Sequence, residues 1–189
     1  MNLIYLRHAI AMEREEFATY CLKKGIESDD EHRPLTKMGV RRMSQAAHGL
    51  NKALGSLNIA SAPLIVSSPL KRARQTADIA AQTMQREGRV VLCDALKPGV
   101  EPEVFRNWLY DLLHSGARRR ILNQQTIVAV GHEPSLSRHV TWWLTGEVKS
   151  KFPVKKGGAI CLEIGNAMAP GQGRMMWALP PWALRALDD

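Results

Sequence analysis

Four short apolar runs recur along the chain, and longer stretches with helical spacing of their apolar residues separate them. The runs are residues 2–6, 63–67, 89–93 and 126–130. Continuous apolar runs of this length are typical of strands buried on both faces, and strands that alternate with helices favour a parallel sheet. The sequence therefore predicts an α/β fold, a three-layer α/β/α sandwich with a mainly parallel central sheet and an antiparallel edge strand.

The edge strand is expected from the last part of the chain, where two apolar segments flank a Gly/Pro-rich turn and predict a hairpin. Thr36 is the expected N-cap of the first of four helices, and Pro69 is expected at the first position of the second, where its missing N–H costs nothing. The hairpin covers residues 159–164 and 174–178, and the helices cover 37–54, Ser68-Pro69 to about Gln85, 102–114 and Pro134 to about 145.

The chain has 189 residues, which suits a single domain over residues 1–189 with one hydrophobic core. Residues 10–32 mix charges and predict a long insertion loop with a helical turn around residues 14–24. Such a loop is either a lid or specificity element beside a pocket, or a surface insertion without a role. Residues 180–189 form a C-terminal tail that is expected to dock through Trp182 and Leu184.

Composition narrows the class of protein without naming its partner. Hydrophobic residues make up 45% of the chain, and the net charge of +8 at pH 7 favours anionic partners in general. The basic run Arg118–Arg120 is interpreted as a solvated turn. No apolar stretch approaches the roughly 20 residues of a membrane span, and the N-terminus has no signal-peptide layout. We therefore expect a cytoplasmic protein with no membrane partner, and reduced thiols at Cys21, Cys93 and Cys161.

Unusual polar residues follow three of the predicted strands. The first strand ends at Arg7-His8, the second is followed by Arg72 one helical turn after Ser68, and the fourth ends at His132. In open α/β sheets, ligands collect beyond the carboxyl ends of the strands, so these side chains are expected to converge. Two imidazoles and two guanidiniums, together with helix N-termini, suit a phosphoryl group, whose charge is spread over three oxygens.

Within this pocket, a neutral imidazole is the expected nucleophile for phosphorus. Neighbouring arginines disfavour protonation of His8, and its second ring nitrogen is expected to donate to a backbone carbonyl, which fixes the tautomer. Arg74 competes with Arg72 for the anion, but it lies two residues further along the helix and is expected to face elsewhere. Arg7, His8, Arg72 and His132 are therefore the candidate catalytic residues.

Five segments in a fixed order carry these residues and two further motifs. They are Leu6-Arg7-His8-Ala9, Arg33-Pro34-Leu35-Thr36-x-x-Gly39, Ser68-Pro69-Leu70-Lys71-Arg72-Ala73-Arg74-Gln75-Thr76, Leu96-Lys97-Pro98-Gly99 and Val130-Gly131-His132-Glu133-Pro134. Each is weak alone, but together they resemble the histidine phosphatase (phosphoglycerate mutase-like) superfamily. The second and fourth segments resemble its small SixA-like phosphohistidine phosphatase branch. Residues 10–32 depart from that branch, whose corresponding link is usually shorter.

The resemblance implies a role for each matching residue. His8 would carry the phosphoryl group, Arg7 and Arg72 would hold phosphate oxygens, and His132 would stabilise the transferring group. Glu133 is also assigned to the phosphate-binding set. The superfamily needs no cofactor and no metal. Larger members supply a carboxylic acid for the leaving oxygen, and Glu101 is the candidate for it here, with Glu133 as the other choice.

We therefore expect a metal-independent phosphatase that forms a phosphohistidine at His8, with protein phosphohistidine as the expected substrate because imidazole leaves without strong acid help. The alternatives are a phosphatase of small phosphoesters such as a sugar phosphate or a nucleotide, a phosphomutase, and a non-catalytic phospho-ligand binding module. The expected partner is a phosphorylated protein or a small phosphorylated substrate. A nucleic-acid partner is not expected, since net charge is its only support.

Overall fold

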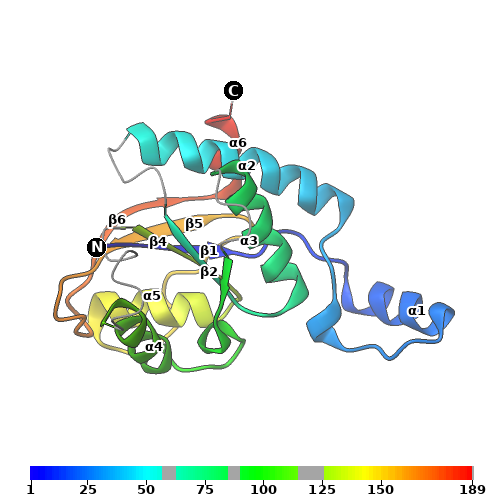
Figure 1. Cartoon of the computed structure of the whole chain (residues 1–189), viewed down its shortest axis with the longest axis horizontal. Coiled ribbons are helices and arrows are strands. Elements are labelled where there is room, and N and C mark those ends of the chain that lie inside the picture. The colour runs from blue at the N-terminus through cyan, green and yellow to red at the C-terminus, as the bar shows by residue number, and fades with distance from the viewer. Residues whose placement is uncertain (57–62, 85–89, 115–125, 189) are drawn as a thin grey trace.

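The computed structural model describes residues 1–56, 63–84, 90–114 and 126–188, and it confirms the predicted fold class (Figure 1). This part of the chain forms a six-stranded sheet in the order β3-β2-β4-β1-β5-β6. The strands are β1 (Asn2–Arg7), β2 (Leu64–Ser67), β3 (Val90–Leu92), β4 (Thr126–Gly131), β5 (Ala159–Glu163) and β6 (Arg174–Leu179). The first four are parallel, and β5 pairs antiparallel with both β1 and β6.

Helices cover both faces of the sheet. In Figure 1, α2, α3 and α6 lie above it, and α4 and α5 lie below it. The α-helices are α1 (Arg14–Lys24), α2 (Lys37–Ser56), α3 (Lys71–Thr83), α4 (Pro102–His114), α5 (Ser135–Thr145) and α6 (Pro181–Ala186). Two short 3₁₀ helices, η1 (Asp30–His32) and η2 (Asp94–Leu96), lie in the connections. Residue 89, Gln85 and the Arg118–Arg120 run lie outside the described residues.

Strand β1 occupies the middle of the sheet and is buried on both faces. Its side chains alternate, so Ile4 and Leu6 pack into the core beneath α2 and α3, whereas Leu3 and Tyr5 pack into the core against α4 and α5. The Tyr5 hydroxyl accepts a hydrogen bond from the indole N–H of Trp143 at 2.7 Å. This packing explains the continuous apolar run in the sequence, and it holds the end of β1 in a rigid frame.

The start of α2 is held against the chain that leaves β1. The hydroxyl of Thr36 accepts the backbone N–H of Gly39 at 2.9 Å, which confirms Thr36 as the N-cap. A Cβ at Gly39 would stand 2.0 Å from the carbonyl oxygen of Ile10. Only glycine permits this approach, so the Thr36-x-x-Gly39 spacing fixes α2 next to the segment that follows His8.

Helix α3 begins at Lys71, and the prediction that Pro69 opens it is wrong by two residues. The backbone N–H of Ser68 still bonds the Val130 carbonyl at 2.9 Å, so the chain is extended at Ser68 and turns afterwards. The Ser68 hydroxyl accepts the N–H of Leu70 at 3.4 Å within this turn. The sheet therefore extends further than the capping pattern alone indicates.

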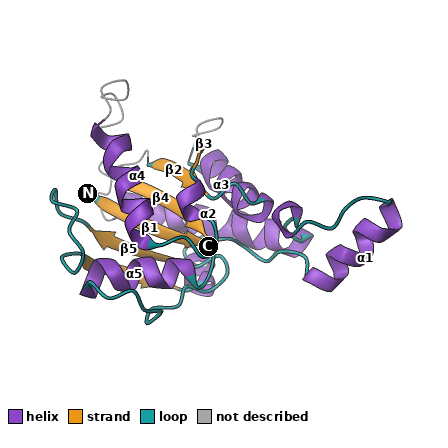
Figure 2. Cartoon of the chain, turned by 90° about the horizontal axis from the view of Figure 1, so that it is seen from below, coloured by secondary structure: helices purple, strands orange, loops and turns teal. Residues whose placement is uncertain are grey.

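The 10–32 segment contains a full helix, α1, which projects away from the sheet in both views (Figures 1 and 2). Acidic residues in its first turn, basic residues in its last turn and a left-handed Gly25 after it favour this helix. An isolated bridge between Ala11 and Leu35 closes the base of the segment. The prediction of a loop with one helical turn therefore understated its regular structure.

The C-terminal tail docks through one of its two predicted anchors. Leu184 is fully buried against α2, where a Cβ at Gly49 would stand 1.8 Å from the Leu184 carbonyl oxygen. Trp182 lies on the other side of α6 and is 67% exposed, so its prediction as an anchor is wrong. A helix of six residues has one side to bury, and the tight contact at Gly49 selects the side that carries Leu184.

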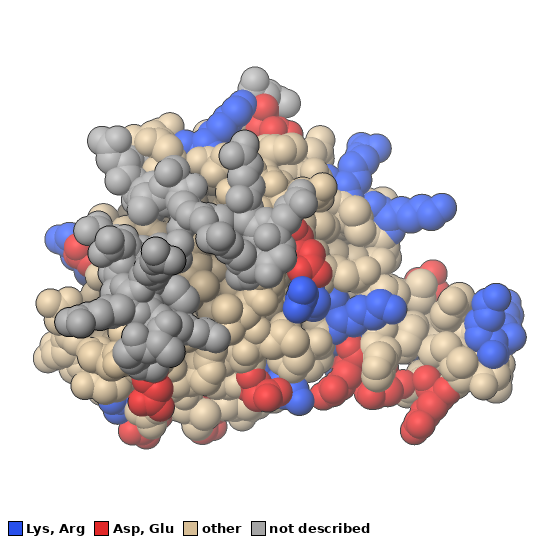
Figure 3. All heavy atoms as spheres, viewed as in Figure 1, with Lys and Arg blue, Asp and Glu red and all other residues tan. Residues whose placement is uncertain are grey.

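Lys and Arg side chains are scattered over the face shown in Figure 3, and no single basic patch gathers there. The described helices include none that is both long enough and apolar enough to cross a membrane.

Candidate active site

The sheet brings the predicted strand ends together. Arg7 pairs with Gly131 across β1 and β4, and Ser67 pairs with Val130 across β2 and β4. The backbone N–H of His8 continues the ladder to the Gly131 carbonyl at 3.1 Å. Because parallel strands end at the same edge, the residues that follow them converge on one point, as the sequence predicts.

His8 presents one ring nitrogen to the pocket. Its Nδ1 lies 2.7 Å from the Ala9 carbonyl oxygen, and because a carbonyl only accepts, Nδ1 carries the hydrogen. This confirms the predicted backbone partner and leaves Nε2 with its lone pair. Burial, together with the charges of Arg72, Arg7 and Lys156, lowers the pKa of His8 to about 4, although the bond to Ala9 raises it. The ring is therefore neutral near pH 7, the form that attacks phosphorus.

His132 lies beside His8 with ring centroids 5.1 Å apart. Its Nε2 is 2.9 Å from the Ser68 hydroxyl. That hydroxyl also accepts the Leu70 N–H at 3.4 Å. Where it donates its own hydrogen to Nε2, Nδ1 of His132 carries the ring hydrogen. Nδ1 is buried without a partner in the described part of the chain. Burial, and next to it His8, lower the pKa of His132 far below its usual value.

The two arginines share one arrangement. Arg7 donates through Nη1 to the Val154 carbonyl at 2.9 Å, and Arg72 donates through Nη1 to the Asp30 carbonyl at 2.8 Å. The Nε atoms of both arginines are buried and have no partner among the described residues. Buried donors without acceptors cost free energy, so an anion that accepts from them is bound favourably.

Arg74 takes no part in this arrangement. Its Nε donates to Asp78 at 2.8 Å, and its side chain is 40% exposed. Arg72 has a side chain that is only 5% exposed. The structure therefore places Arg72 and not its competitor at the strand ends.

Asp30 was missed by the sequence reasoning. Its Oδ2 lies 3.1 Å from Nη2 of Arg72, and its carbonyl takes Nη1, so Asp30 holds the outer end of the guanidinium. Its Oδ1 also accepts from Arg33 at 2.8 Å and from Arg14 at 3.3 Å. Burial raises the pKa of Asp30, but the bond from Arg33 and the charges of Arg72, Arg33 and Arg14 outweigh it and hold the pKa below its usual value. The 10–32 segment thus contacts the site.

Lys156 is a second residue that the motifs did not indicate. It lies in a turn whose Gly157 N–H bonds the Arg7 carbonyl at 3.1 Å, while the Arg7 N–H bonds the Gly158 carbonyl at 3.1 Å. Gly157 has φ of 76°, a conformation that favours glycine. These bonds fix the turn beside β1 and place the Lys156 ammonium close enough to lower the pKa of His8.

The two candidate acids lie in different surroundings. Glu101 accepts both of its short contacts from Arg138, at 2.6 and 2.8 Å, in an exposed ion pair. Glu133 accepts the Val154 N–H at 2.7 Å, and the Val154 carbonyl binds Arg7. Burial raises the pKa of Glu133, while the Val154 bond and the charge of Arg7 lower it by less. Glu133 therefore positions Arg7 through the backbone of Val154.

Thr76 and Gln75 of α3 also serve the site. The Thr76 hydroxyl accepts the Ala9 N–H at 3.1 Å, which steadies the residue that holds His8. The Gln75 amide oxygen accepts the Leu35 N–H at 2.8 Å and so ties α3 to the base of the 10–32 segment. Over the residues that the structure describes, no group of three or more His, Cys, Asp or Glu side chains is arranged to hold a metal ion.

The strand ends thus bring together a neutral imidazole and two arginines with buried, unpartnered Nε atoms. The chain belongs to the histidine phosphatase superfamily. The family model described as histidine phosphatase superfamily (branch 1) matches residues 18–97. An uncharacterized protein of Picosynechococcus sp. (strain ATCC 27264 / PCC 7002 / PR-6) is 32% identical over 172 residues, which cover 88% of this chain and 87% of that protein.

Two solved structures share the fold. The protein histidine phosphatase SixA complexed with tungstate has a TM-score of 0.72 at 18% identity, over 97% of this chain and 99% of that one. A mycobacterial glucosyl-3-phosphoglycerate phosphatase complexed with VO3 has a TM-score of 0.65 at 16% identity, over 95% and 99%. The family match includes Arg72 but neither His8 nor His132, and it is the sheet that places these two beside Arg72.

Proposed function

We propose that this phosphatase transfers the phosphoryl group of its substrate to Nε2 of His8 and then hydrolyses the phosphohistidine, with protein phosphohistidine as its substrate. The observation that carries the chemistry is the bond from Nδ1 of His8 to the Ala9 carbonyl, together with the lowered pKa. Both leave Nε2 as an unprotonated nucleophile in a pocket that offers the buried, unpartnered Nε–H donors of Arg7 and Arg72 and the unpartnered Nδ1 of His132.

The reaction has two steps. In the first, the Nε2 lone pair forms an N–P bond while the bond from phosphorus to the leaving nitrogen breaks, and that nitrogen takes the electron pair and a proton from solvent. In the second, a water oxygen bonds phosphorus, the N–P bond breaks, and Nε2 recovers its lone pair as the water proton passes to solvent. Arg7, Arg72 and His132 neutralise the phosphoryl oxygens in both steps.

The ease with which imidazole leaves supports phosphohistidine as the substrate class. An imidazole leaves more easily than an alkoxide, so phosphohistidine needs little help from an acid. Glu101 is held by Arg138, and Glu133 is held by the Val154 N–H, so neither candidate is free in the described structure. The shared fold with the protein histidine phosphatase SixA supports the same choice.

A panel of substrates tests the proposal. Wild type and His8→Ala are compared on a phosphohistidine-bearing protein, p-nitrophenyl phosphate, a sugar phosphate and a nucleotide, each with and without a metal chelator. We expect the highest kcat/KM on phosphohistidine, no effect of the chelator, and loss of activity in His8→Ala. Equal rates for wild type and His8→Ala would show that His8 does not carry the phosphoryl group.

A second candidate is a phosphatase of small phosphoesters. It is favoured by Glu133, whose pKa is raised by burial and which lies within the electrostatic reach of Arg7. A protonated Glu133 would supply the proton that an alkoxide needs. In that case Glu133→Gln would lower kcat on a sugar phosphate at least tenfold and leave phosphohistidine hydrolysis almost unchanged. Equal losses on both substrates point to the positioning of Arg7 instead.

A further inference from the structure

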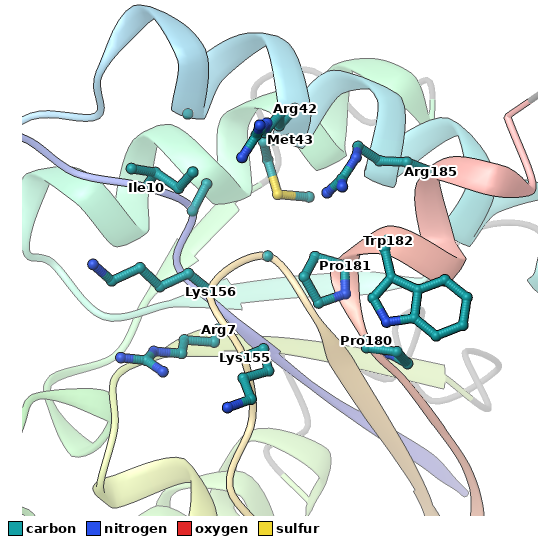
Figure 4. Close-up of a pocket in the computed structure, with 13 residues that line it drawn as sticks. Arg7, Ile10, Arg42, Met43, Lys155, Lys156, Pro180, Pro181, Trp182 and Arg185 are labelled. Atoms are coloured by element: carbon teal, nitrogen blue, oxygen red, sulfur yellow. The ribbon is translucent and has the colours of Figure 1, made fainter.

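A cavity of about 630 Å³ opens beside Arg7. Figure 4 shows Arg7 and Lys156 at one end of it and Trp182 at the other. Its walls are apolar, with Ile10 and Met43 on one side and Pro180 and Pro181 on the other. A volume of this size exceeds what a phosphoryl group alone requires and suits a larger part of a substrate.

Cations from four elements surround this cavity. Arg42 comes from α2, Arg185 from α6, and Lys155 and Lys156 from the turn before β5, in addition to Arg7 at the end of β1. The lining includes no Asp or Glu. We call this cavity the basic cleft, with Arg7, Arg42, Lys155, Lys156 and Arg185 as its cations and Trp182 at its far end.

Most cations of the basic cleft have no acidic partner in the part of the chain that the structure describes, whereas other arginines of the protein do. Arg72 is paired with Asp30, and Arg138 is paired with Glu101. Arg42, Lys155 and Arg185 have no ion pair within the described residues, and Lys156 has only Glu13 at 3.8 Å, with a Glu13 side chain that is 76% exposed. Like charges around a concave surface repel one another and raise the local potential, which favours an anionic ligand.

The basic cleft is continuous with the phosphate pocket, because Arg7 belongs to both. A group attached to the phosphorylated residue can therefore reach the cleft while phosphorus lies at His8. The exposed indole of Trp182 and the two prolines beside it offer an apolar surface to the same chain. The complementary ligand is a short segment with a carboxylate and an apolar side chain.

We propose that the basic cleft binds an acidic side chain of the segment that flanks the phosphohistidine in the substrate protein, with Arg42 and Arg185 as its specificity residues. This inference rests on the proposed function, since it assigns the cleft to the same substrate. It predicts that acidic residues near the phosphohistidine raise kcat/KM through binding and leave the chemical step unchanged.

Matched peptides test it. Each peptide carries one phosphohistidine, and a single position two to four residues before or after it holds either Glu or Gln. For every such position, kcat/KM of the Glu peptide is divided by kcat/KM of the Gln peptide to give the Glu/Gln ratio. In wild type we expect a ratio of about two to five at one or two positions, a range that corresponds to one charged contact at a partly exposed site. The difference should lie in KM and should shrink at high salt.

Variants assign the effect to the cleft. In Arg42→Gln and Arg185→Gln the ratio should fall toward one, and in Arg42→Lys it should persist because the charge remains. The matched control is Arg41→Gln, which removes the same charge from the residue of α2 that precedes Arg42. Arg41 does not line the cavity, so the Glu/Gln ratio should stay at its wild-type value. Circular dichroism checks that each variant is folded.

The outcomes separate the two proposals. A ratio of one at every position in wild type, or a ratio that survives the double change of Arg42 and Arg185 to Gln, overturns the basic cleft while phosphohistidine hydrolysis stands. If neither peptide is hydrolysed although p-nitrophenyl phosphate is hydrolysed through His8, the substrate class and the cleft assignment are both wrong. If His8→Ala matches wild type, the proposed function itself is wrong.

Discussion

The protonation of His8 gives a sharp prediction for the free enzyme. Burial and the neighbouring cations lower its pKa from 6.5 to about 4. At pH 5.5 an ordinary histidine is only about 10% neutral, whereas a group with a pKa of about 4 is about 97% neutral. The shift corresponds to about 3 kcal/mol of differential interaction between the two protonation states. The nucleophile should therefore be available throughout the range from pH 5 to pH 8.

Long-range proton–nitrogen NMR of protein labelled at its histidine rings measures this directly. The His8 signal, identified by its loss in His8→Gln, should show hydrogen on Nδ1 and none on Nε2, and should begin to titrate only below about pH 5. Free histidine in the same buffer is the reference. A midpoint near 6.5, or hydrogen on Nε2 at pH 7, would refute the role of the Ala9 carbonyl and of burial.

Removal of single charges tests the cause of the shift. Burial is the largest cause, and among the charges Arg72 outranks Arg7, and Arg7 outranks Lys156. We therefore expect Arg72→Gln to raise the His8 pKa more than Lys156→Gln does, and neither change to restore 6.5. If Lys156→Gln alone restored the ordinary value, charge and not burial would control the nucleophile.

Three further predictions follow from the same contacts. Asp30→Asn removes the carboxylate that holds Arg72, and steady-state assays should show kcat/KM lowered about five- to tenfold, because a partly exposed ionic contact contributes about 1 kcal/mol. A rise in kcat/KM would show instead that Asp30 competes with the phosphoryl group for Arg72. Ser68→Ala removes the hydroxyl partner of His132, so kcat should fall about tenfold, and urea denaturation should show a free energy of unfolding that is lower by about 1–3 kcal/mol. Ser68→Thr keeps the hydroxyl and should retain both the wild-type kcat and the wild-type stability. Burial lowers the pKa of His139 to about 4, so the unfolded chain binds the extra proton, and His139 should lower the free energy of unfolding by up to about 3 kcal/mol between pH 6.5 and pH 4. This fall should be smaller in His139→Gln, and an equal fall in the variant would contradict the prediction.

Much of the candidate site could be predicted because its residues lie next to strong local signals. His8 and His132 each follow an apolar run at once, and Arg72 follows Ser68 by one helical turn. Once strands are parallel and adjacent, the ends must meet, so the convergence needs no further information. The tautomer of His8 could also be anticipated, because the nearest acceptor to the ring is the next carbonyl along the chain.

Other parts of the site carry no such signal. Asp30 lies in a cluster of three acidic residues, and the sequence does not distinguish the one that reaches Arg72, which is 42 positions away. Lys156 precedes two glycines without any recognisable motif, and only the two backbone bonds to Arg7 place it beside His8. Glu101 was a reasonable candidate acid by position, but Arg138 on another helix holds its carboxylate.

The sequence by itself determined the alternation of strands and helices, the order of the motifs and the identity of the four central residues. These features depend on periodicity and on neighbours within a few positions, which the chain displays directly. The tertiary structure decided which side chains complete the pocket, that Trp182 stays exposed, and that the basic cleft adjoins Arg7. Those outcomes depend on contacts between distant segments, whose geometry is set by how the helices pack onto the sheet and not by any local pattern.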